Sequence, residues 1–360
     1  MHTGPSTPLL LLLLLLGASA PARTDAGSPA AGSPAAGSPA AVPPRTLGRV
    51  ERLDAALDRL VPADAAIEVI AEGFDWPEGP VWIPDGGYLL FSDVPRDTIY
   101  RWQADDGLSA WLKPSGYTGA VERGGEMGSN GLLLDAAGRL VLCQHGDRRM
   151  ARLDAPLTAP SPRFVTLAAA YDGKRFNSPN DAVFAAAGDL YFTDPPYGLA
   201  GGPDDPAREL DFHGVYRVTP AGDVTLLTAD LTRPNGIALS PDERTLYVAN
   251  SDPERAVWMA YELAAGVLGP GRVFFDATDR VGKRPGLPDG LAVDRDGNLF
   301  ATGPGGVLVL SPAGVHLGTL DTTRHAANCT FGGDGSTLYV TADDYLLRVR
   351  LTTKGQGYGD

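Results

Sequence analysis

Residues 233–248 read RPNGIALSPDERTLYV, and residues 287–301 read LPDGLAVDRDGNLFA. Each stretch opens with a short polar motif, continues as an apolar run, turns at Asp or Gly, and ends as a second apolar run. Short apolar runs between turn signals are typical of buried β-strands, so each stretch predicts a tightly connected strand pair. The same plan recurs from residues 77, 129, 178 and 327, which makes six copies.

The spacing of the copies predicts the fold. They lie roughly 40 to 55 residues apart, as four-stranded propeller blades do. Further apolar runs between the copies, such as residues 214–218 and 306–310, supply outer strands. We therefore predict an all-β, six-bladed β-propeller over residues 46–360. The spare apolar segment at residues 66–71 is expected to join the last blade, because closing the ring removes an exposed sheet edge.

The start of the chain carries other signals. An unbroken leucine run, Leu9 to Leu16, is followed by Gly-Ala-Ser-Ala, which predicts a signal peptide at residues 1–20 and export to the periplasm or beyond the cell. Three copies of Gly-Ser-Pro-Ala-Ala predict a disordered linker over residues 21–45. A short amphipathic helix is predicted next, from apolar residues at three- and four-residue spacing: Leu47, Val50, Leu53, Leu57 and Leu60.

Composition narrows the classes of partner. The formal net charge is −14, which argues against nucleic acid, because nucleic-acid binding needs basic patches. An acidic body is compatible with a bound cation. No membrane partner is expected once the signal peptide is removed. The two cysteines, Cys143 and Cys329, lie in separate apolar runs, so we expect buried free thiols, although export also permits a disulfide.

One position of the six aligned copies always carries a side-chain oxygen. The innermost strands of a propeller start near its axis, so equivalent residues of all blades are expected to point into one small space. The residues at this position are Glu78, Asn130, Asn180, Asn235, Asp289 and Asn328. Asn or Asp before Gly is also a common turn signal, and this alternative accounts for Asn235 and Asp289 but not for Glu78.

Such a cluster of oxygen atoms predicts a metal ion. Without a counter-charge the two carboxylates would repel each other and the buried acceptors would lack partners, and a hard cation relieves both problems. All-oxygen ligands with neutral amides among the carboxylates suit Ca²⁺. Mg²⁺, Mn²⁺ and Zn²⁺ stay open as alternatives, with Zn²⁺ disfavoured because no His or Cys occupies the position.

Five motifs, taken in order, resemble the gluconolactonase, senescence-marker-protein and luciferin-regenerating-enzyme family: WPEGP at 76–80, SPND at 178–181, FTDPPYG at 192–198, RPNG at 233–236 and PDG at 288–290. More distantly they are similar to paraoxonases and diisopropyl fluorophosphatase. The resemblance covers residues 47–360 and implies a six-bladed propeller with a catalytic calcium ion. It also implies the metal ligands, which are Glu78, Asn180, Asn235 and Asp289, with Asn180 contacting substrate in some members.

The second strand of each copy ends at the same face as the aligned position. These ends are predicted to bring Asp93, His145, Asp194 and Asn250 to a ring around the axis. We predict His145 as a second catalytic residue, with a histidine satisfied by neighbouring backbone as the alternative. Substrate binding is assigned to Asn130, Asn180, Asp194 and Trp76, and Tyr197 is expected to wall the pocket unless these aromatic rings serve packing alone.

Together these residues predict metal-assisted hydrolysis of a sugar lactone. The cation would stabilise the oxyanion while a carboxylate activates water. Asp289 is the predicted base, or a nucleophile, with Asp181 and Asp194 as alternative bases. No Gly-x-Ser-x-Gly motif supports a serine mechanism. Two other functions stay open: an arylesterase or organophosphate hydrolase on the same scaffold, and a non-catalytic propeller that binds a ligand.

Overall fold

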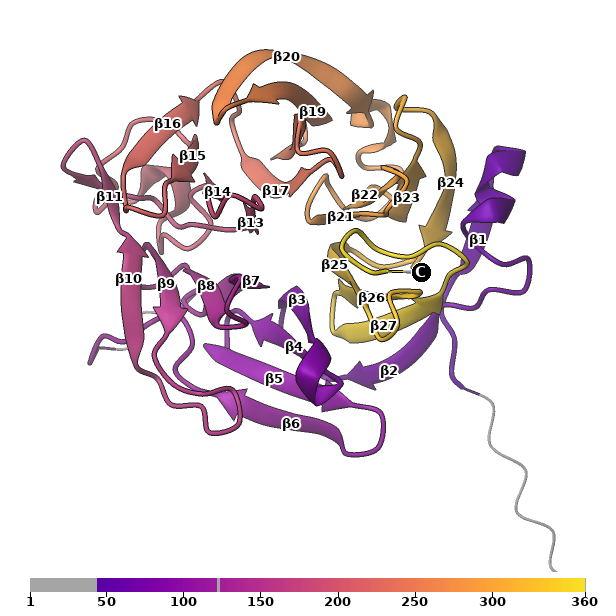
Figure 1. Ribbon diagram of the computed structural model, residues 1–360, viewed down its shortest axis with the longest axis horizontal. Helices are drawn as coiled ribbons and strands as arrows, with labels where there is room; N and C mark the ends of the chain where they lie inside the picture. Colours follow the sequence, from indigo (N-terminus) through magenta and orange to yellow (C-terminus); the bar gives the residue numbers. More distant parts are fainter. Residues whose placement is uncertain (1–43, 122–123, 360) are drawn as a thin grey trace, which may run out of the picture. The chain divides into compact units, whose positions relative to one another are not determined.

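Six antiparallel β-sheets follow one another around a ring in the computed structural model, which describes residues 44–121 and 124–359 (Figure 1). The predicted all-β, six-bladed propeller is confirmed. The predicted signal peptide at residues 1–20 and the predicted linker up to residue 43 lie outside the described residues.

Each of the first four blades is a meander of four consecutive strands. The strands, from the axis outward, are β3 (Pro77–Ile83), β4 (Tyr88–Asp93), β5 (Thr98–Gln103) and β6 (Gly107–Leu112) in blade 1; β7 (Ser129–Leu134), β8 (Leu140–Gln144), β9 (Arg149–Leu153) and β10 (Phe164–Ala168) in blade 2; β13 (Ala182–Phe184), β14 (Leu190–Asp194), β15 (Gly214–Val218) and β16 (Val224–Thr228) in blade 3; and β17 (Pro234–Leu239), β18 (Thr245–Asp252), β19 (Arg255–Ala264) and β20 (Val267–Asp276) in blade 4.

The last two blades each take an outermost strand from the start of the described chain. Blade 5 is built from β21 (Leu291–Val293), β22 (Leu299–Gly303), β23 (Gly306–Leu310), β24 (His316–Asp321) and β1 (Arg49–Arg52), and blade 6 from β25 (Ala326–Gly332), β26 (Thr337–Ala342), β27 (Tyr345–Arg350) and β2 (Glu68–Glu72). Outside the blades lie the β-pair β11 (Ala170–Tyr171) with β12 (Lys174–Arg175) and the 3₁₀ turns η1 (Ala55–Arg59), η2 (Pro84–Gly86), η3 (Gly202–Asp204) and η4 (Thr278–Arg280).

Ring closure follows the prediction for residues 66–71. Strand β2 pairs antiparallel with β27, with Glu68 opposite Arg348 and Glu72 opposite Tyr345. Blade 6 therefore contains strands from both ends of the described chain, and Figure 1 shows the indigo β2 beside the yellow β27. Opening the ring requires breaking this ladder of backbone hydrogen bonds.

The amphipathic helix predicted over residues 47–60 is wrong. Residues 49–52 form β1 on the edge of β24, and only Ala55–Arg59 turns helically, as the 3₁₀ element η1. The unpaired edge of β24 offers backbone hydrogen bonds that outweigh helical periodicity, because exposed strand edges readily accept another strand. The apolar spacing was therefore misleading: Leu57 is fully buried, whereas Leu53 is 61% exposed.

The apolar cores lie between neighbouring sheets. Between blades 4 and 5, Tyr247 and Trp258 pack with Leu299 and Leu308. Because both faces of such a sheet are covered, its inner strands read as continuous apolar runs rather than as an alternation. Cys143 and Cys329 belong to these cores, and both are buried free thiols, as predicted.

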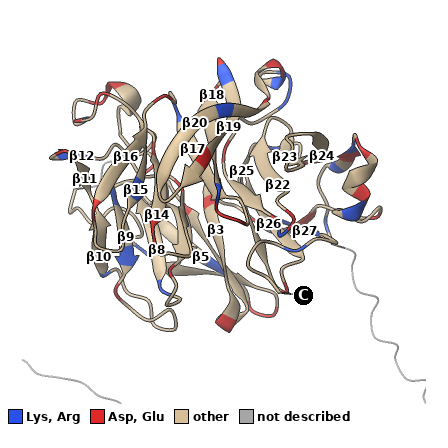
Figure 2. Ribbon diagram, turned by 45° about the horizontal axis from the view of Figure 1, so that its top comes forward, with Lys and Arg blue, Asp and Glu red and all other residues tan. Residues whose placement is uncertain are grey.

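The outside of the ring carries mixed charge. Lys and Arg are interspersed with Asp and Glu over the strands and loops (Figure 2). Several of these residues form ion pairs between strands, such as Arg217 with Asp189 at 2.7 Å and Arg348 with Glu68 at 2.5 Å. Within the described ranges, no helix has the length and apolar character needed to cross a bilayer.

Candidate active site

The innermost strands of the blades begin around a cavity of about 620 Å³. Five of the six aligned residues line it, one from each of blades 1 to 5: Glu78, Asn130, Asn180, Asn235 and Asp289. The sixth, Asn328, instead lines a second cavity, of about 900 Å³, with later residues of the innermost strands. A hydrogen bond from the Asn328 side chain nevertheless lowers the pKa of Glu78, so all six aligned residues lie near one another and five of them line the first cavity.

Glycines allow these residues to approach one another. A Cβ on Gly79 would lie 2.1 Å from the carbonyl oxygen of Asn130, and one on Gly236 would lie 2.2 Å from that of Asp289. Each glycine follows the axial residue of its own blade and touches the axial residue of the next blade. The Glu-Gly pair of blade 1 lies within strand β3 and the Asn-Gly pair of blade 4 within strand β17, and neither lies in a turn. Close backbone approach, rather than turn geometry, therefore accounts for these pairs.

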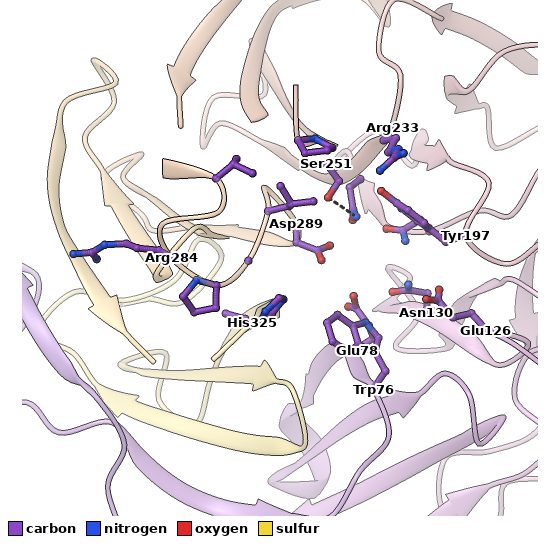
Figure 3. A pocket seen from close by; sticks show the side chains of 18 of the residues that line it. Trp76, Glu78, Glu126, Asn130, Tyr197, Arg233, Ser251, Arg284, Asp289 and His325 are labelled. Atoms are coloured by element: carbon purple, nitrogen blue, oxygen red, sulfur yellow. Dashed lines mark hydrogen bonds between the residues drawn. The ribbon is translucent and has the colours of Figure 1, made fainter. Parts of the chain in front are cut away.

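Burial strongly perturbs the two axial carboxyl groups. Glu78 is 2% exposed, and burial raises its pKa to about 8 although the backbone N–H of Gly79 donates to its carboxylate at 3.0 Å. Burial, with the nearby charge of Glu78, raises the pKa of Asp289 well above its usual range. Figure 3 shows the two carboxyl groups pointing toward one another. Each disfavours the charged form of the other, as two neighbouring carboxylates do.

Two buried acceptors in the cavity have no hydrogen-bond partner among the described residues: Oδ1 of Asp289 and Oδ1 of Asn130. Leaving such an acceptor unpaired costs about 1–3 kcal/mol. No group of three or more His, Cys, Asp or Glu side chains in the described ranges is arranged to hold a metal ion. The axial set instead combines two carboxylates with amide oxygens, and an orphaned Asp289 oxygen in such a set fits a hard cation that takes all-oxygen ligands.

The cavity walls are aromatic and cationic. Trp76 and Tyr197 both line the cavity, as predicted for the pocket walls, and Arg233 lies beside Tyr197 in Figure 3. Residues 281–287 form another part of the wall. Arg284 of this segment is held from outside by Glu51 of β1, through hydrogen bonds of 2.7 and 2.9 Å.

Four residues predicted at the ends of the second strands do not line the cavity, namely Asp93, His145, Asp194 and Asn250, whereas Ser251 at the end of β18 does. Asp194 is fully buried, and its carboxylate accepts the backbone N–H groups of Asn177 and Ser178 at 2.8 and 2.7 Å. Asp93 accepts those of Asp75 and Trp76 in the same way. These side chains therefore fix the loops that carry the axial residues. The substrate-binding role predicted for Asp194 has no support in this placement, because the carboxylate does not reach the cavity.

His145 also lies outside the cavity. Its ring is fully buried, and its Nδ1 is 3.6 Å from Oε2 of Glu126, which does line the cavity. Direct contact between His145 and a substrate, as the sequence predicted, is not supported by this arrangement. His145 therefore contacts a residue of the cavity wall, Glu126, without lining the cavity itself.

A model of the SMP-30/gluconolactonase/LRE-like region matches residues 76–344, which includes all five axial residues of the cavity. The chain belongs to this family. Its gluconolactonase relative from Zymomonas mobilis is 39% identical over 322 residues, covering 86% of this chain and 88% of that protein. At this similarity the chain is a gluconolactonase-type lactonase, a hydrolase.

Solved structures agree with this family membership. A gluconolactonase from Xanthomonas campestris is 33% identical, with a TM-score of 0.73, covering 87% of this chain and 98% of that one. A regucalcin from Agrobacterium tumefaciens, described as a calcium-binding protein, is 20% identical with a TM-score of 0.60, covering 81% of this chain and 95% of that one. At that identity the second likeness shows the shared fold alone.

Sequence reasoning missed several cavity residues of this lactonase. Arg233, Lys283 and His325 line the cavity but were not predicted to do so, and no catalytic role was predicted for Glu126, which also lines it. Arg233 lies two residues before the axial Asn235, inside a motif that was recognised, so its position next to the axis was a usable signal. Glu126 and Lys283 come from loops without a repeated pattern, and nothing in their local sequence indicates the cavity.

Proposed function

We propose that this protein is an exported lactonase that hydrolyses a sugar lactone at one axial divalent cation, with Ca²⁺ as the metal. The observation that carries the proposal is the pair of carboxyl groups, Glu78 and Asp289, together with the orphaned Oδ1 of Asp289. A bound cation would neutralise the negative charge of the two carboxylates and would give Oδ1 of Asp289 a partner.

The metal would be held by Glu78, Asn180, Asn235 and Asp289, a set of oxygen ligands that includes two neutral amides. Such a set suits Ca²⁺ better than Zn²⁺, which prefers His and Cys. A bound divalent cation supplies positive charge that stabilises the negative charge developing on the lactone carbonyl oxygen. The remaining chemistry belongs to the side chains.

Asp289 takes a proton from the attacking water as the general base. The alternatives considered from the sequence fit the geometry less well. Both carboxylate oxygens of Asp194 accept backbone N–H groups, and this residue is fully buried. Asp181 lines the second cavity and not the one that holds Asp289. Asp289 is therefore the only one of the three proposed bases that lines the 620 Å³ cavity.

A sugar lactone fits the polar character of the cavity. Trp76 and Tyr197 offer flat apolar surfaces for a ring, and the amides of Asn130 and Asn180 offer donors and acceptors for hydroxyl groups. The similarity to the gluconolactonase from Zymomonas mobilis supports the same substrate class.

The test is hydrolysis of D-glucono-1,5-lactone by the purified protein, followed as acid release with and without EDTA. We expect release that EDTA abolishes and that Ca²⁺ restores. The Asp289→Asn variant is then assayed for bound metal and for turnover separately. Turnover that survives in this variant with metal bound would remove Asp289 as the base, and release that is insensitive to EDTA would remove the metal from the mechanism.

Export is supported by the leucine run at residues 9–16 and the small residues that follow it. The test is the N-terminal sequence of the protein recovered from the periplasm or medium of its own host. We expect it to begin at Pro21. A protein that stays in the cytoplasm with residues 1–20 attached would contradict export.

A further inference from the structure

The cavity contains a third carboxyl group, for which the hydrolysis described so far has no role. Glu126 lies in the loop between β6 and β7, four residues before Asn130, and lines the same cavity as Glu78 and Asp289. Figure 3 shows its side chain beside that of Asn130, directed into the cavity. It is not at an aligned axial position, so it is separate from the proposed metal ligands.

Two different environments meet at this carboxyl group. On one side, its Oε2 lies 3.6 Å from Nδ1 of His145, whose ring is fully buried. On the other side, 36% of the Glu126 side chain is exposed. Partial removal of this carboxyl group from water raises its pKa to about 7. The other titratable groups that sense its charge are Glu78, Asp289 and Tyr197.

Opening a lactone requires a proton on the leaving oxygen. The ring C–O bond of the tetrahedral intermediate breaks with its electron pair on oxygen, and an aliphatic alkoxide is a poor leaving group unless it is protonated as the bond breaks. Asp289 becomes protonated when water attacks, and a different group that already holds a proton allows the ring to open without waiting for Asp289 to return that proton. A second carboxyl group at the cavity, holding a proton near neutral pH, meets this need.

We propose that Glu126 is the general acid that protonates the leaving ring oxygen, and that His145 is a positioning residue that holds the Glu126 carboxyl group toward the cavity. The inference rests on the proposed lactone hydrolysis. One proton of the attacking water goes to Asp289 and the other stays on the new carboxyl group, while the proton of Glu126 goes to the ring oxygen. Exchange with solvent then returns Asp289 and Glu126 to their starting states.

The test uses two lactones that differ in their leaving group. When D-glucono-1,5-lactone opens, the leaving ring oxygen is an aliphatic alkoxide. When dihydrocoumarin opens, the leaving oxygen is a phenolate, whose conjugate acid has a pKa of about 10 like that of tyrosine. A general acid matters more for the poorer leaving group. For Glu126→Gln we expect kcat to fall about 100-fold on gluconolactone, and only a few-fold on dihydrocoumarin. Glu126→Asp should recover part of the loss, and the exposed Glu254→Gln should change neither rate.

Three readouts decide the proposal. Bound metal is measured for each variant, and Glu126→Gln is expected to retain it. The wild-type kcat should fall as pH rises through the pKa of Glu126, and His145→Gln should shift this limb. Equal losses of kcat on both lactones, loss of bound metal, or unchanged rates in Glu126→Gln would each overturn the role of Glu126. An unshifted limb in His145→Gln would overturn the role of His145, whereas a wild type inactive on every lactone would instead refute the proposed function.

Discussion

The carboxylate of Asp194 accepts the backbone N–H of Ser178 at 2.7 Å, two residues before the axial Asn180. The same relationship recurs around the ring. In blade 4 the side-chain oxygen of Asn250 accepts the N–H of Arg233 at 2.9 Å, two residues before Asn235. The end of the second strand thus holds the loop that delivers the axial side chain. Through this hydrogen bond the second strand of a blade helps to fix the position of the axial side-chain oxygen.

Replacing Asp194 by Ala should damage both stability and catalysis. The substitution leaves the buried N–H groups of Asn177 and Ser178 without acceptors, and each unsatisfied buried group costs about 1–3 kcal/mol. We expect a loss of this order in the free energy of unfolding, measured with urea, and a fall in kcat/KM because Asn180 loses its support. Asp105→Ala, at an exposed position, serves as control. A stable variant with unchanged kcat/KM would show that the loop carrying Asn177 and Ser178 keeps its conformation without Asp194.

The fold was predictable because its signal is repeated. Each blade repeats an apolar run, a turn and a second run, so an error in one copy is corrected by the others. The helix predicted over residues 47–60 had no such support. Its true structure, β1 on the edge of β24, depends on a partner strand about 270 residues later in the chain, and local periodicity carries no information about that edge.

The site was predictable only along the axis. Alignment identified Glu78, Asn235 and Asp289 as residues of one cavity because strand starts in a propeller share one position. The same reasoning placed Asp194 and His145 beside substrate. A polar residue at a strand end binds either backbone or ligand, and the sequence alone does not distinguish the two. No role was predicted for Glu126, because its loop carries no repeated pattern.

Gly236→Ala should disturb the axis more than its small size suggests. A Cβ at this position would lie 2.2 Å from the carbonyl oxygen of Asp289 and 2.7 Å from Cα of Gly290, and backbone atoms cannot give way as a flexible side chain can. We expect blades 4 and 5 to move apart, with a large loss of both kcat and bound metal. Gly359→Ala has open space around its Cβ and is the control. Wild-type metal binding in Gly236→Ala would refute the close-approach argument.

The ion pair between Glu51 and Arg284 predicts a specific pH dependence of stability. Hydrogen bonding to Arg284 lowers the pKa of Glu51 to about 2, below the value of about 4.3 expected in the unfolded chain. The folded pKa is depressed, so the stabilisation is complete above the unfolded pKa and is lost as pH falls toward 2. Glu51→Gln should therefore lower the unfolding free energy by about 1 kcal/mol at pH 7. This difference should shrink below about pH 4.

Urea denaturation of wild type and Glu51→Gln across this pH range is the measurement. Glu72→Gln is the control, because the Glu72 and Arg45 side chains are 51% and 54% exposed, and exposed pairs contribute little. A difference between wild type and Glu51→Gln that is the same at pH 3 and pH 7 would show that the charge of Glu51 is not the source of the stabilisation.

Removing one axial carboxylate should separate folding from metal binding. Wild-type protein in EDTA keeps Glu78 and Asp289 together without a counter-ion, and Ca²⁺ at 100 times its Kd should stabilise the fold by about 2.7 kcal/mol. Asp289→Asn removes the repulsion, so we expect its melting temperature in EDTA to equal or exceed that of wild type. The same variant should lose most of the rise that Ca²⁺ produces. Glu254→Gln, at an exposed position outside the cavity, should keep that rise. Equal Ca²⁺-dependent shifts in wild type and Asp289→Asn would place the cation elsewhere.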